Sequence, residues 1–414
     1  MRSSTPWNNS LAVPPSAACH DQIPLLWLTG CQCPDHNTLW RFYRSHRPAM
    51  RRLLKETVAI AVHVGYVDLA LQAIDGTKVV ANASGDRTCD EAKLARLLDR
   101  AETAIASLEA QNETDDENPP PPMPPELRRA QRLKEQVQAA QERLREEGRK
   151  RVNLTDGDAD LMKGRREIAP SYNAQAIVSP AGTGEGQHHG MLITAADVVD
   201  KPTDYAQLAP MLEEAEAMTG VRSGVVLADG GYYSGANLEA ARGRGQRLVT
   251  PAQERRRDRG AYFKDQFVYD KATDTYRCPE DQVLYFSGMG KANGKTPVRI
   301  YRGLKAVCHG CPAYGICTKD KHSGRVLMVG SADLRLRDHR VWMATEEARL
   351  LYAQRKGLIE PVFGIMKEQM SGRRFLLRGL ANVRAEFALL ATAFNLRMLW
   401  KQWAKGFDPL SISA

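Results

Sequence analysis

Leu69-Ala-Leu-Gln-Ala-Ile-Asp-Gly-Thr-Lys-Val-Val-Ala-Asn82 is the stretch that points most directly to a fold, because apolar and β-branched residues surround an Asp-Gly pair. It predicts a strand with Asp75 at its centre. A second apolar run, at 224–228, leads directly into Asp229 and two glycines. Each carboxylate would lie on or at the end of an apolar strand. An unpaired charge is costly to bury there, so such an acid usually has a cation or a hydrogen-bond partner.

Strand-like and helix-like segments surround these two runs. Further strands are expected over 172–178 and 191–198, a helix over 205–218, and mainly helix over 344–405. A β-rich middle covered by helices is an α/β arrangement. The expected core is assembled from three pieces, 68–88, 151–255 and 340–405.

Four other parts precede or interrupt this core. Two amphipathic helical segments joined by a proline-rich turn predict an inserted helical hairpin. A stretch of short strands that contains tyrosines and cysteines predicts a small β insertion. The parts are a poorly ordered N-terminus (1–24), a helical module (25–67), the hairpin (89–150) and the Cys-containing insertion (256–339).

The helical module carries a basic surface. Asp35 or Asn37 could cap a helix over 38–44, and a second helix is expected over 47–65. The module is expected to bind DNA and to be a truncated form of a longer helical domain. Arginines also occur toward the C-terminus, over 373–397. The residues expected to contact DNA are Arg41, Arg44, Arg51, Arg355, Lys367, Arg373 and Arg374.

The balance of charge narrows the class of partner. The 414 residues include 58 Lys and Arg against 49 Asp and Glu, a net charge of +9, which suits a polyanion. Hydrophobic residues make up 43% and charged residues 26%, an ordinary globular mixture. Because no run of eighteen apolar residues occurs, no membrane span is expected. The cytoplasm is the expected location, with association to the nucleoid when the protein binds DNA.

Four of the eight cysteines form a group. Cys308 and Cys311 have the Cys-x2-Cys spacing of a zinc knuckle, with Cys278 and Cys317 on either side. A structural zinc site and reduced packing thiols are both open interpretations, and His309 or His322 could replace one thiol. A site with four protein ligands has no open position, so catalysis there is not expected.

A third acidic segment, Tyr-Ala-Gln-Arg-Lys-Gly-Leu-Ile-Glu-Pro over 352–361, places Glu360 in a basic helical stretch. Neighbouring carboxylates repel one another unless divalent ions neutralise them. Phosphodiester chemistry uses such acids to hold two ions roughly 3.5–4 Å apart. An Asp-Gly after a strand can instead be a simple turn. Because Glu360 precedes Pro361, we expect a kink or a new helix start there.

These segments resemble the DDE transposases of bacterial insertion sequences, specifically the insertion-sequence 1182 family, over residues 25–403. The block from Tyr352 to Phe375 is the most specific, with Tyr, Arg, Glu and Lys in the order of the related insertion-sequence 4 signature. Four residues separate Arg355 from Glu360, where the wider signature has three. The other matching stretches are 28–30, 34–38, 156–162, 172–175, 278–279 and the continuation from 377 to 395.

The resemblance implies a ribonuclease-H-like mixed sheet flanked by helices. Asp75 would lie on its first strand, Asp229 on its fourth, and Glu360 on a helix that packs across the sheet. The three carboxylates would hold Mg²⁺, with Mn²⁺ able to substitute, because all three ligands are hard oxygens.

The implied activity is DNA transposition. The protein would bind the terminal inverted repeats, hydrolyse a phosphodiester at each end with a metal-activated water, and transfer the 3′-hydroxyl ends to target DNA. Joining two ends implies a homodimer on double-stranded DNA. No nucleotide requirement is expected. Two alternatives stay open at this point: a ribonuclease-H-like nuclease without strand transfer, and an inactive or truncated DNA-binding relic.

Overall fold

The structure is a computed structural model with a mixed α/β fold. The expectation of a poorly ordered N-terminus falls on residues 1–24, of which 1–18 and 21 lie outside the described residues. The chain divides into two compact units, Met1–Ser223 with Lys356–Ala414 (unit 1) and Gly224–Arg355 (unit 2). The domain boundaries expected from the sequence stay a prediction. The described residues are 19–20, 22–112, 125–164, 167–182, 190–252, 260–293 and 296–404.

Unit 1 contains an antiparallel sheet centred on β5 (Ile168–Ala181). One edge of β5 pairs with β1 (Leu71–Val80), and the other pairs with β4 (Asp160–Lys163) and then β6 (Gly190–Val199). β1, β5 and β6 confirm the strands predicted around Asp75 and over 172–178 and 191–198. Nearly all of β5 is buried. Side chains on both faces of this central strand are therefore covered.

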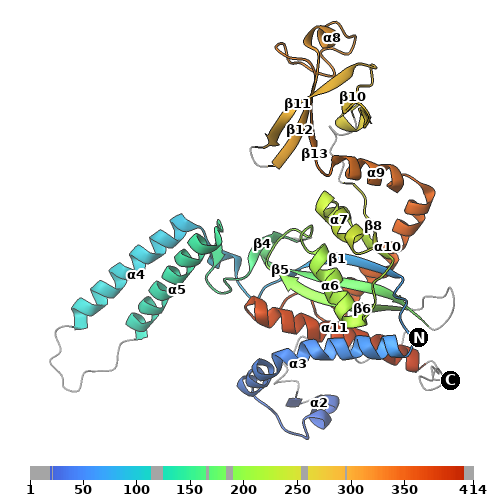
Figure 1. The fold of residues 1–414 in the computed structure, drawn as a ribbon. Helices are drawn as coiled ribbons and strands as arrows, with labels where there is room; N and C mark the ends of the chain where they lie inside the picture. The colour runs from blue at the N-terminus through green and yellow to red at the C-terminus, as the bar shows by residue number, and fades with distance from the viewer. Residues whose placement is uncertain are drawn as a thin grey trace, which may run out of the picture. The chain divides into compact units, whose positions relative to one another are not determined.

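Three helices pack around this sheet (Figure 1). α6 (Leu208–Thr219) packs on β5 and β6, α11 (Leu380–Trp403) packs on β6, and α3 (His36–His63) runs beside α11. Buried Asn395 of α11 joins these layers. Its amide accepts from the Ile193 N–H of β6 and donates to the Ile193 carbonyl, both at 2.9 Å, and also donates to the Thr57 hydroxyl of α3 at 3.3 Å. The short helix α2 (Ile23–Leu28) precedes α3.

α3 is one continuous helix with Pro48 inside it, whereas the sequence predicted two helices. The helix begins at the Asp35 cap, whose side chain accepts the Thr38 N–H at 2.6 Å. A proline removes one backbone hydrogen bond from a helix interior. The buried stripe of Met50, Leu54 and Val58 lies just after it. We attribute the continuity to this packing, which outweighs the local proline signal.

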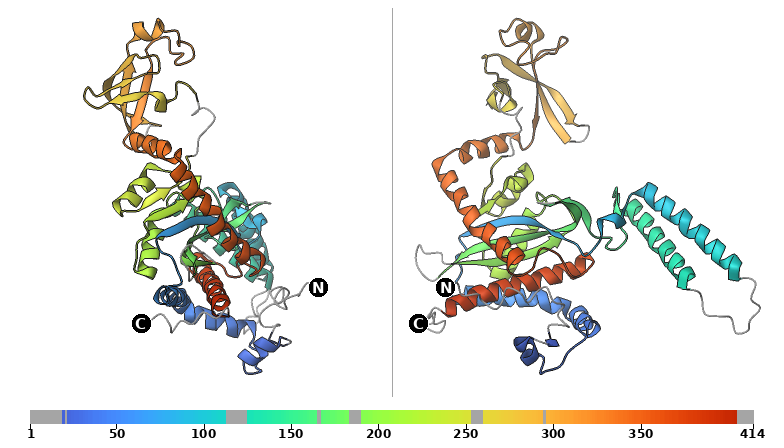
Figure 2. Two further views of the ribbon diagram at one scale, coloured as in Figure 1. Left: turned by 90° about the vertical axis from the view of Figure 1, so that its right-hand side faces the viewer. Right: turned by 180° about the vertical axis from the view of Figure 1, so that it is seen from behind.

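α4 (Glu91–Asn112) and α5 (Pro125–Glu147) lie side by side (Figure 2). At the base of this hairpin, β2 (Thr88–Cys89) pairs with β3 (Val152–Asn153), so the two ends of the insertion meet. The ten-residue strand β1 and the 3₁₀ turn at Gly85–Arg87 precede it. The hairpin has its own apolar core, consisting of Cys89, Leu94, Val137, Ala140, Leu144 and Val152.

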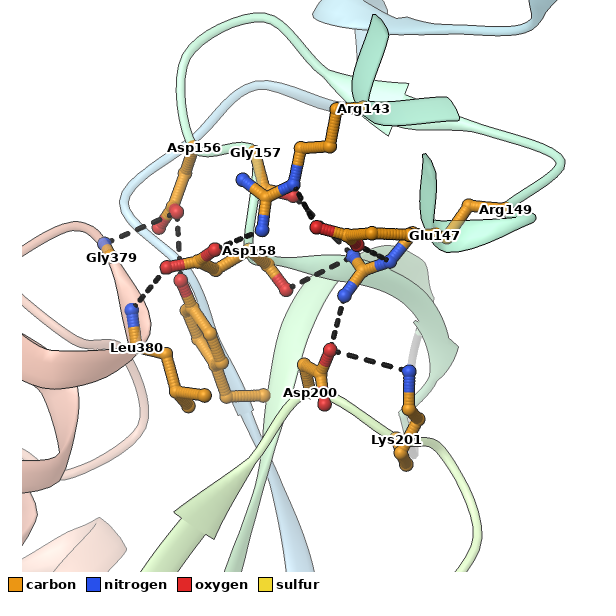
Figure 3. Close-up of polar contacts among 11 residues, drawn as sticks. Arg143, Glu147, Arg149, Asp156, Gly157, Asp158, Asp200, Lys201, Gly379 and Leu380 are labelled. Carbon is orange, nitrogen blue, oxygen red and sulfur yellow. Dashed lines mark hydrogen bonds and ion pairs between the residues drawn. The ribbon is translucent and has the colours of Figure 1, made fainter. Parts of the chain in front are cut away.

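A network of charges ties the hairpin base to the first turn of α11 (Figure 3). Asp156 accepts the Gly379 N–H at 3.2 Å, and Asp158 accepts the Leu380 N–H at 2.6 Å. Carboxylates favour a helix N-terminus, where the N–H groups are unpaired. Arg143 of α5 forms an ion pair with Asp158. Burial alone would raise the pKa of Asp158, but the Leu380 and Arg143 hydrogen bonds lower it overall.

This network assigns a role to the stretch 156–162, for which the sequence offered none. A second arginine of the network, Arg149, forms ion pairs with Glu147 and with Asp200, and Asp200 follows β6. The Tyr172 hydroxyl of β5 donates to Asp156 at 2.7 Å. The base of the hairpin is thus bonded to the sheet as well as to α11.

Unit 2 begins with a parallel pair of strands, β7 (Val225–Ala228) and β8 (Arg247–Val249), which confirms the apolar strand predicted before Asp229. The 3₁₀ turn Gly230–Tyr232 and α7 (Gly235–Gly243) connect them. A five-stranded antiparallel sheet follows, and the helices α8 (Lys305–His309) and α9 (Asp333–Met343) accompany it. Its strands are β9 (Val268–Asp270), β10 (Thr275–Arg277), β11 (Val283–Ala292), β12 (Thr296–Gly303) and β13 (Val326–Gly330).

α10 (Glu346–Glu368) passes through Pro361 without interruption. Of the kink or new helix start expected near Glu360, the new start was therefore wrong. Pro361 lacks only the N–H that would bond the carbonyl of Gly357. Gly357 is exposed, so water can satisfy that carbonyl. Buried Ile359, Val362 and Met366 keep the helix packed on both sides of the proline. Within the described residues, no helix is both long and apolar enough to cross a membrane.

Candidate active site

Asp75 lies at the middle of β1, opposite Ala176 of β5 in the strand register. Its carboxylate is half-buried and accepts the N–H of Gly76 at 2.8 Å. In a strand, alternate residues share a face, so Asp75 and Thr77 lie on the same side of the sheet. α10 is attached to this side of β1, through the Thr77 side chain.

The ammonium group of Lys367 fastens α10 to β1. It donates to the Thr77 hydroxyl at 2.5 Å and to the Lys78 carbonyl at 2.9 Å. The chain after α10 then pairs with the end of β1, through Val80 N–H to the Arg373 carbonyl and Phe375 N–H to the Val80 carbonyl. These bonds fix the C-terminal part of α10 relative to the strand that bears Asp75.

Glu360 is exposed on this fastened helix, seven residues before Lys367. In a continuous helix that spacing is close to two turns, so both side chains project from one face about 10 Å apart along the axis. Gly357 and Gly364 lie about one turn to either side of Glu360. A Cβ atom added at either glycine would meet nothing within 4 Å. The helix surface beside the Glu360 carboxylate is therefore bare and open.

A polar cluster supports β1 on the face opposite Asp75. Asp204 accepts from buried Asn173 at 2.6 Å and from buried Gln175 at 2.8 Å, and pairs with Lys78 at 3.5 Å. Gly76 makes room for it. A Cβ at Gly76 would lie 2.2 Å from Gln175 Nε2 and 2.5 Å from an Asp204 oxygen. The sequence singled out 172–175 only as a matching stretch, and Asp204 carried no signal, because its partners are distant in the chain.

Replacing Gly76 by Ala is expected to lower the free energy of unfolding by about 1–3 kcal/mol, the usual cost of overpacking. Thermal unfolding measures this directly. Gly357→Ala is the matched control, because its methyl group enters open space and Ala favours a helix over Gly by about 0.5–1 kcal/mol. Equal melting of Gly76→Ala and the wild-type protein would contradict the tight packing described for this cluster.

Asp229 belongs to unit 2, where it directly follows β7 and caps the 3₁₀ turn. Its half-buried carboxylate accepts the Gly231 N–H at 2.8 Å, and its carbonyl accepts the Thr250 hydroxyl at 2.6 Å. His339 bonds the Thr250 carbonyl at 2.9 Å, so Thr250 is itself held in place. Asp229 therefore resembles Asp75 in setting: both follow apolar residues and both accept an N–H from a nearby glycine.

The structure places Asp75 and Glu360 in unit 1 and Asp229 in unit 2. Among the described residues, no three His, Cys, Asp or Glu side chains are gathered in the arrangement of a metal site. The joint action of the three carboxylates on an ion accordingly stays a prediction.

The basic residues expected to contact DNA differ in their surroundings. Arg41 and Arg44 are exposed on α3, whereas Arg51 pairs with Glu214 at 3.0 Å. Arg355 is buried, and Lys367 is bonded to β1 as described above. After α10, exposed Arg373 pairs with Glu368, and exposed Arg374 donates to the Ala81 carbonyl at 3.5 Å. Arg41 and Arg44 are the ones whose surroundings best suit a phosphate contact.

The four grouped cysteines of unit 2 line one small cavity, beside the turn between β10 and β11 and the segment after α8. None of them forms a disulfide. His309 and His322 do not line the cavity; His309 instead bonds the Asp320 carbonyl at 3.1 Å.

Comparison with known families adds one finding. Residues 277–400 match the family model described as "Transposase DDE domain". DDE transposase domains act in DNA transposition. The matched segment includes the cysteine group and all of α10 with Glu360, but neither Asp75 nor Asp229. No curated protein and no solved structure was found to match the chain.

Proposed function

We propose that this chain is a DNA transposase of the DDE type, with a ribonuclease-H-like core and a place in the insertion-sequence 1182 family. The observation that carries the proposal is the attachment of α10 to β1. The helix of the matched domain that bears Glu360 is bonded by Lys367 to the strand that bears Asp75. Asp75 and Glu360, which are far apart in sequence, thus lie on a strand and a helix that are bonded to each other.

The sheet supports the proposed core. Ribonuclease-H-like sheets combine an antiparallel meander with parallel strands. Unit 1 supplies the antiparallel series β1, β5 and β6, and unit 2 supplies the parallel pair β7 and β8. In this proposal Asp75 stands on the first strand of the core, and Asp229 at the end of the fourth.

The donor set suits Mg²⁺ or Mn²⁺, because Asp75, Asp229 and Glu360 offer only carboxylate oxygens and none of the three is fully buried. Bound divalent ions would lower the pKa of a water nucleophile and stabilise the charge that develops on the phosphate. Gly76 and Gly231 each hold one carboxylate oxygen through an N–H, which orients both aspartates. Lys367 acts as a positioning residue for Glu360.

DNA would be bound by exposed basic side chains. Arg41 and Arg44 on α3 are solvent-accessible, and the bare surface at Gly357 and Gly364 leaves room for a phosphate backbone beside Glu360. Such contacts make affinity fall as salt rises, because neutralised phosphates release counterions. A homodimer that holds two element ends would complete the reaction.

The test is a strand-transfer assay with the full chain, labelled DNA that carries the terminal repeats of its element, a supercoiled target, and Mg²⁺ or Mn²⁺. Labelled ends joined to the target are the expected result. End cleavage without joining would support a nuclease instead. Binding without cleavage, in either metal, would support the inactive DNA-binding relic.

A further inference from the structure

The small antiparallel sheet of unit 2 holds four thiols around one cavity. Cys278 comes from the turn between β10 and β11, Cys308 and Cys311 from the end of α8 and the turn after it, and Cys317 from the loop beyond. The cavity has a volume of about 20 Å³. A space that size holds roughly one water-sized atom. Three segments that are separate in sequence therefore surround a space large enough for a single atom.

Two of the sulfur atoms accept hydrogen bonds from the backbone. The Gln282 N–H donates to Cys278 Sγ at 3.3 Å, and the Arg325 N–H donates to Cys308 Sγ at 3.4 Å. Hydrogen bonds to a ligand atom are a common way in which a protein orients that ligand toward a metal. The turn at Cys278 is closed by the Asp281 N–H to the Cys278 carbonyl at 2.9 Å.

Two glycines make space for the Cys308 sulfur. A Cβ at Gly303 would lie 2.7 Å from Cys308 Sγ, and one at Gly324 would lie 3.1 Å from it. A Cβ at Gly324 would also lie 2.2 Å from the Gly303 carbonyl oxygen, so the two glycines pass close to each other beside that sulfur. The backbone around the cavity therefore fits a thiol at position 308 closely.

Charge and stability favour a bound cation over four packed thiols. Arg325 lines the cavity, and its guanidinium donates to the Cys317 carbonyl at 2.9 Å, so a positive charge lies near a site that would gain net negative charge. The sheet has a small core of six buried residues, and Cys278 and Cys317 pack against it; the six are Phe267, Tyr276, Leu284, Tyr301, Leu327 and Val329. Small domains with little core commonly need a metal or disulfides to be stable.

We propose that Cys278, Cys308, Cys311 and Cys317 bind one structural Zn²⁺ ion as thiolates. The four sulfur atoms do not yet have ligand geometry, since the described residues contain no ready metal cluster. Binding would draw them to about 2.3 Å from the ion and release the thiol protons to solvent. Four protein ligands close the site, so the ion has a structural role and the proposal is independent of transposase activity.

The experiment uses the full chain purified under reducing conditions. Metal analysis should find about one zinc per chain, as a single four-cysteine site requires. Stripping the metal with a chelator and adding Co²⁺ should give the absorption bands of tetrahedral cobalt and of thiolate-to-cobalt charge transfer. Zinc should then displace the cobalt. Stripped protein that shows no cobalt spectrum although Cys278, Cys308, Cys311 and Cys317 are reduced would overturn the proposal, and so would a disulfide among these four.

Variants assign the site to these residues. Cys278→Ser and Cys311→Ser should bring zinc content well below one per chain, while Cys31→Ser, an exposed cysteine of unit 1, should leave it unchanged. Cys317→His replaces sulfur by another zinc ligand and should keep the metal with a shifted cobalt spectrum. If the serine variants are insoluble, the cobalt titration of wild-type protein and of Cys317→His decides. Undiminished zinc in soluble Cys278→Ser and Cys311→Ser would refute the assignment.

Discussion

Asp75→Asn should reduce both end cleavage and strand transfer by about a thousandfold or more, since metal-held charge stabilisation is worth several kcal/mol and each 1.36 kcal/mol is a factor of ten. The amide retains the shape of the carboxylate and an oxygen to accept the Gly76 N–H, so β1 should keep its place. What it loses is the anionic ligand. The measurement is the rate of product formation in the strand-transfer assay, with thermal unfolding as the check on folding.

Glu360→Gln should likewise reduce end cleavage and strand transfer by about a thousandfold or more, because it also removes an anionic metal ligand. Binding to the terminal repeats, measured by mobility shift, should be unchanged. Asp99→Asn is the matched control, because Asp99 is an exposed carboxylate on α4 of the inserted hairpin. Its activity should equal that of the wild-type protein. Full joining by Asp75→Asn or Glu360→Gln would show that these residues do not hold the catalytic ions.

Asn395→Ala is expected to lower the free energy of unfolding by roughly 3 kcal/mol or more, because each buried polar group left without a partner costs about 1–3 kcal/mol. Asn395 is fully buried and satisfies both the N–H and the carbonyl of Ile193, an exchange that a neighbouring strand would normally provide. Without the side-chain amide of Asn395, the N–H and the carbonyl of Ile193 would both lose their hydrogen-bond partner between α11 and β6. Denaturant unfolding followed by circular dichroism gives the change.

Two companion variants sharpen this test. Asn395→Asp keeps an acceptor for the Ile193 N–H but loses the donor to its carbonyl, so it should also be destabilised. Asn37→Ala, at an exposed position on α3, should unfold like the wild-type protein. A stability change below about 0.5 kcal/mol in Asn395→Ala, the range of ordinary surface substitutions, would contradict the bridging role.

The sequence allowed the strands around Asp75 and Asp229 to be predicted, because each is a local apolar run next to an Asp-Gly pair. It wrongly divided α3 between residues 44 and 47 and expected a kink or a new helix start near Pro361. Packing of neighbouring buried residues keeps both helices continuous past Pro48 and Pro361. Both errors have one physical cause. A local propensity of a few kcal/mol can be outweighed by burial that depends on the whole fold.

The supporting contacts lay beyond sequence reasoning for a different reason. The partners of Asn395 and Lys367 are hundreds of positions away in the chain, as is the Leu380 partner of Asp158, so no spacing or period reports them. Lys367 illustrates the limit. Its charge suggested a DNA contact, a role that stays a prediction, whereas its bonds to Thr77 and the Lys78 carbonyl became visible only once α10 and β1 were placed together.

The pairing of β2 with β3 has a consequence for the architecture of unit 1. Because Thr88 lies opposite Asn153 and Cys89 opposite Val152, the two ends of the insertion meet in a two-stranded sheet of their own. The insertion through α4 and α5 therefore starts and ends at adjacent positions, as the two residues that flank a tight turn do. An insertion joined in this way can lengthen or shorten without shifting the register of β1 against β5, on which the position of Asp75 depends.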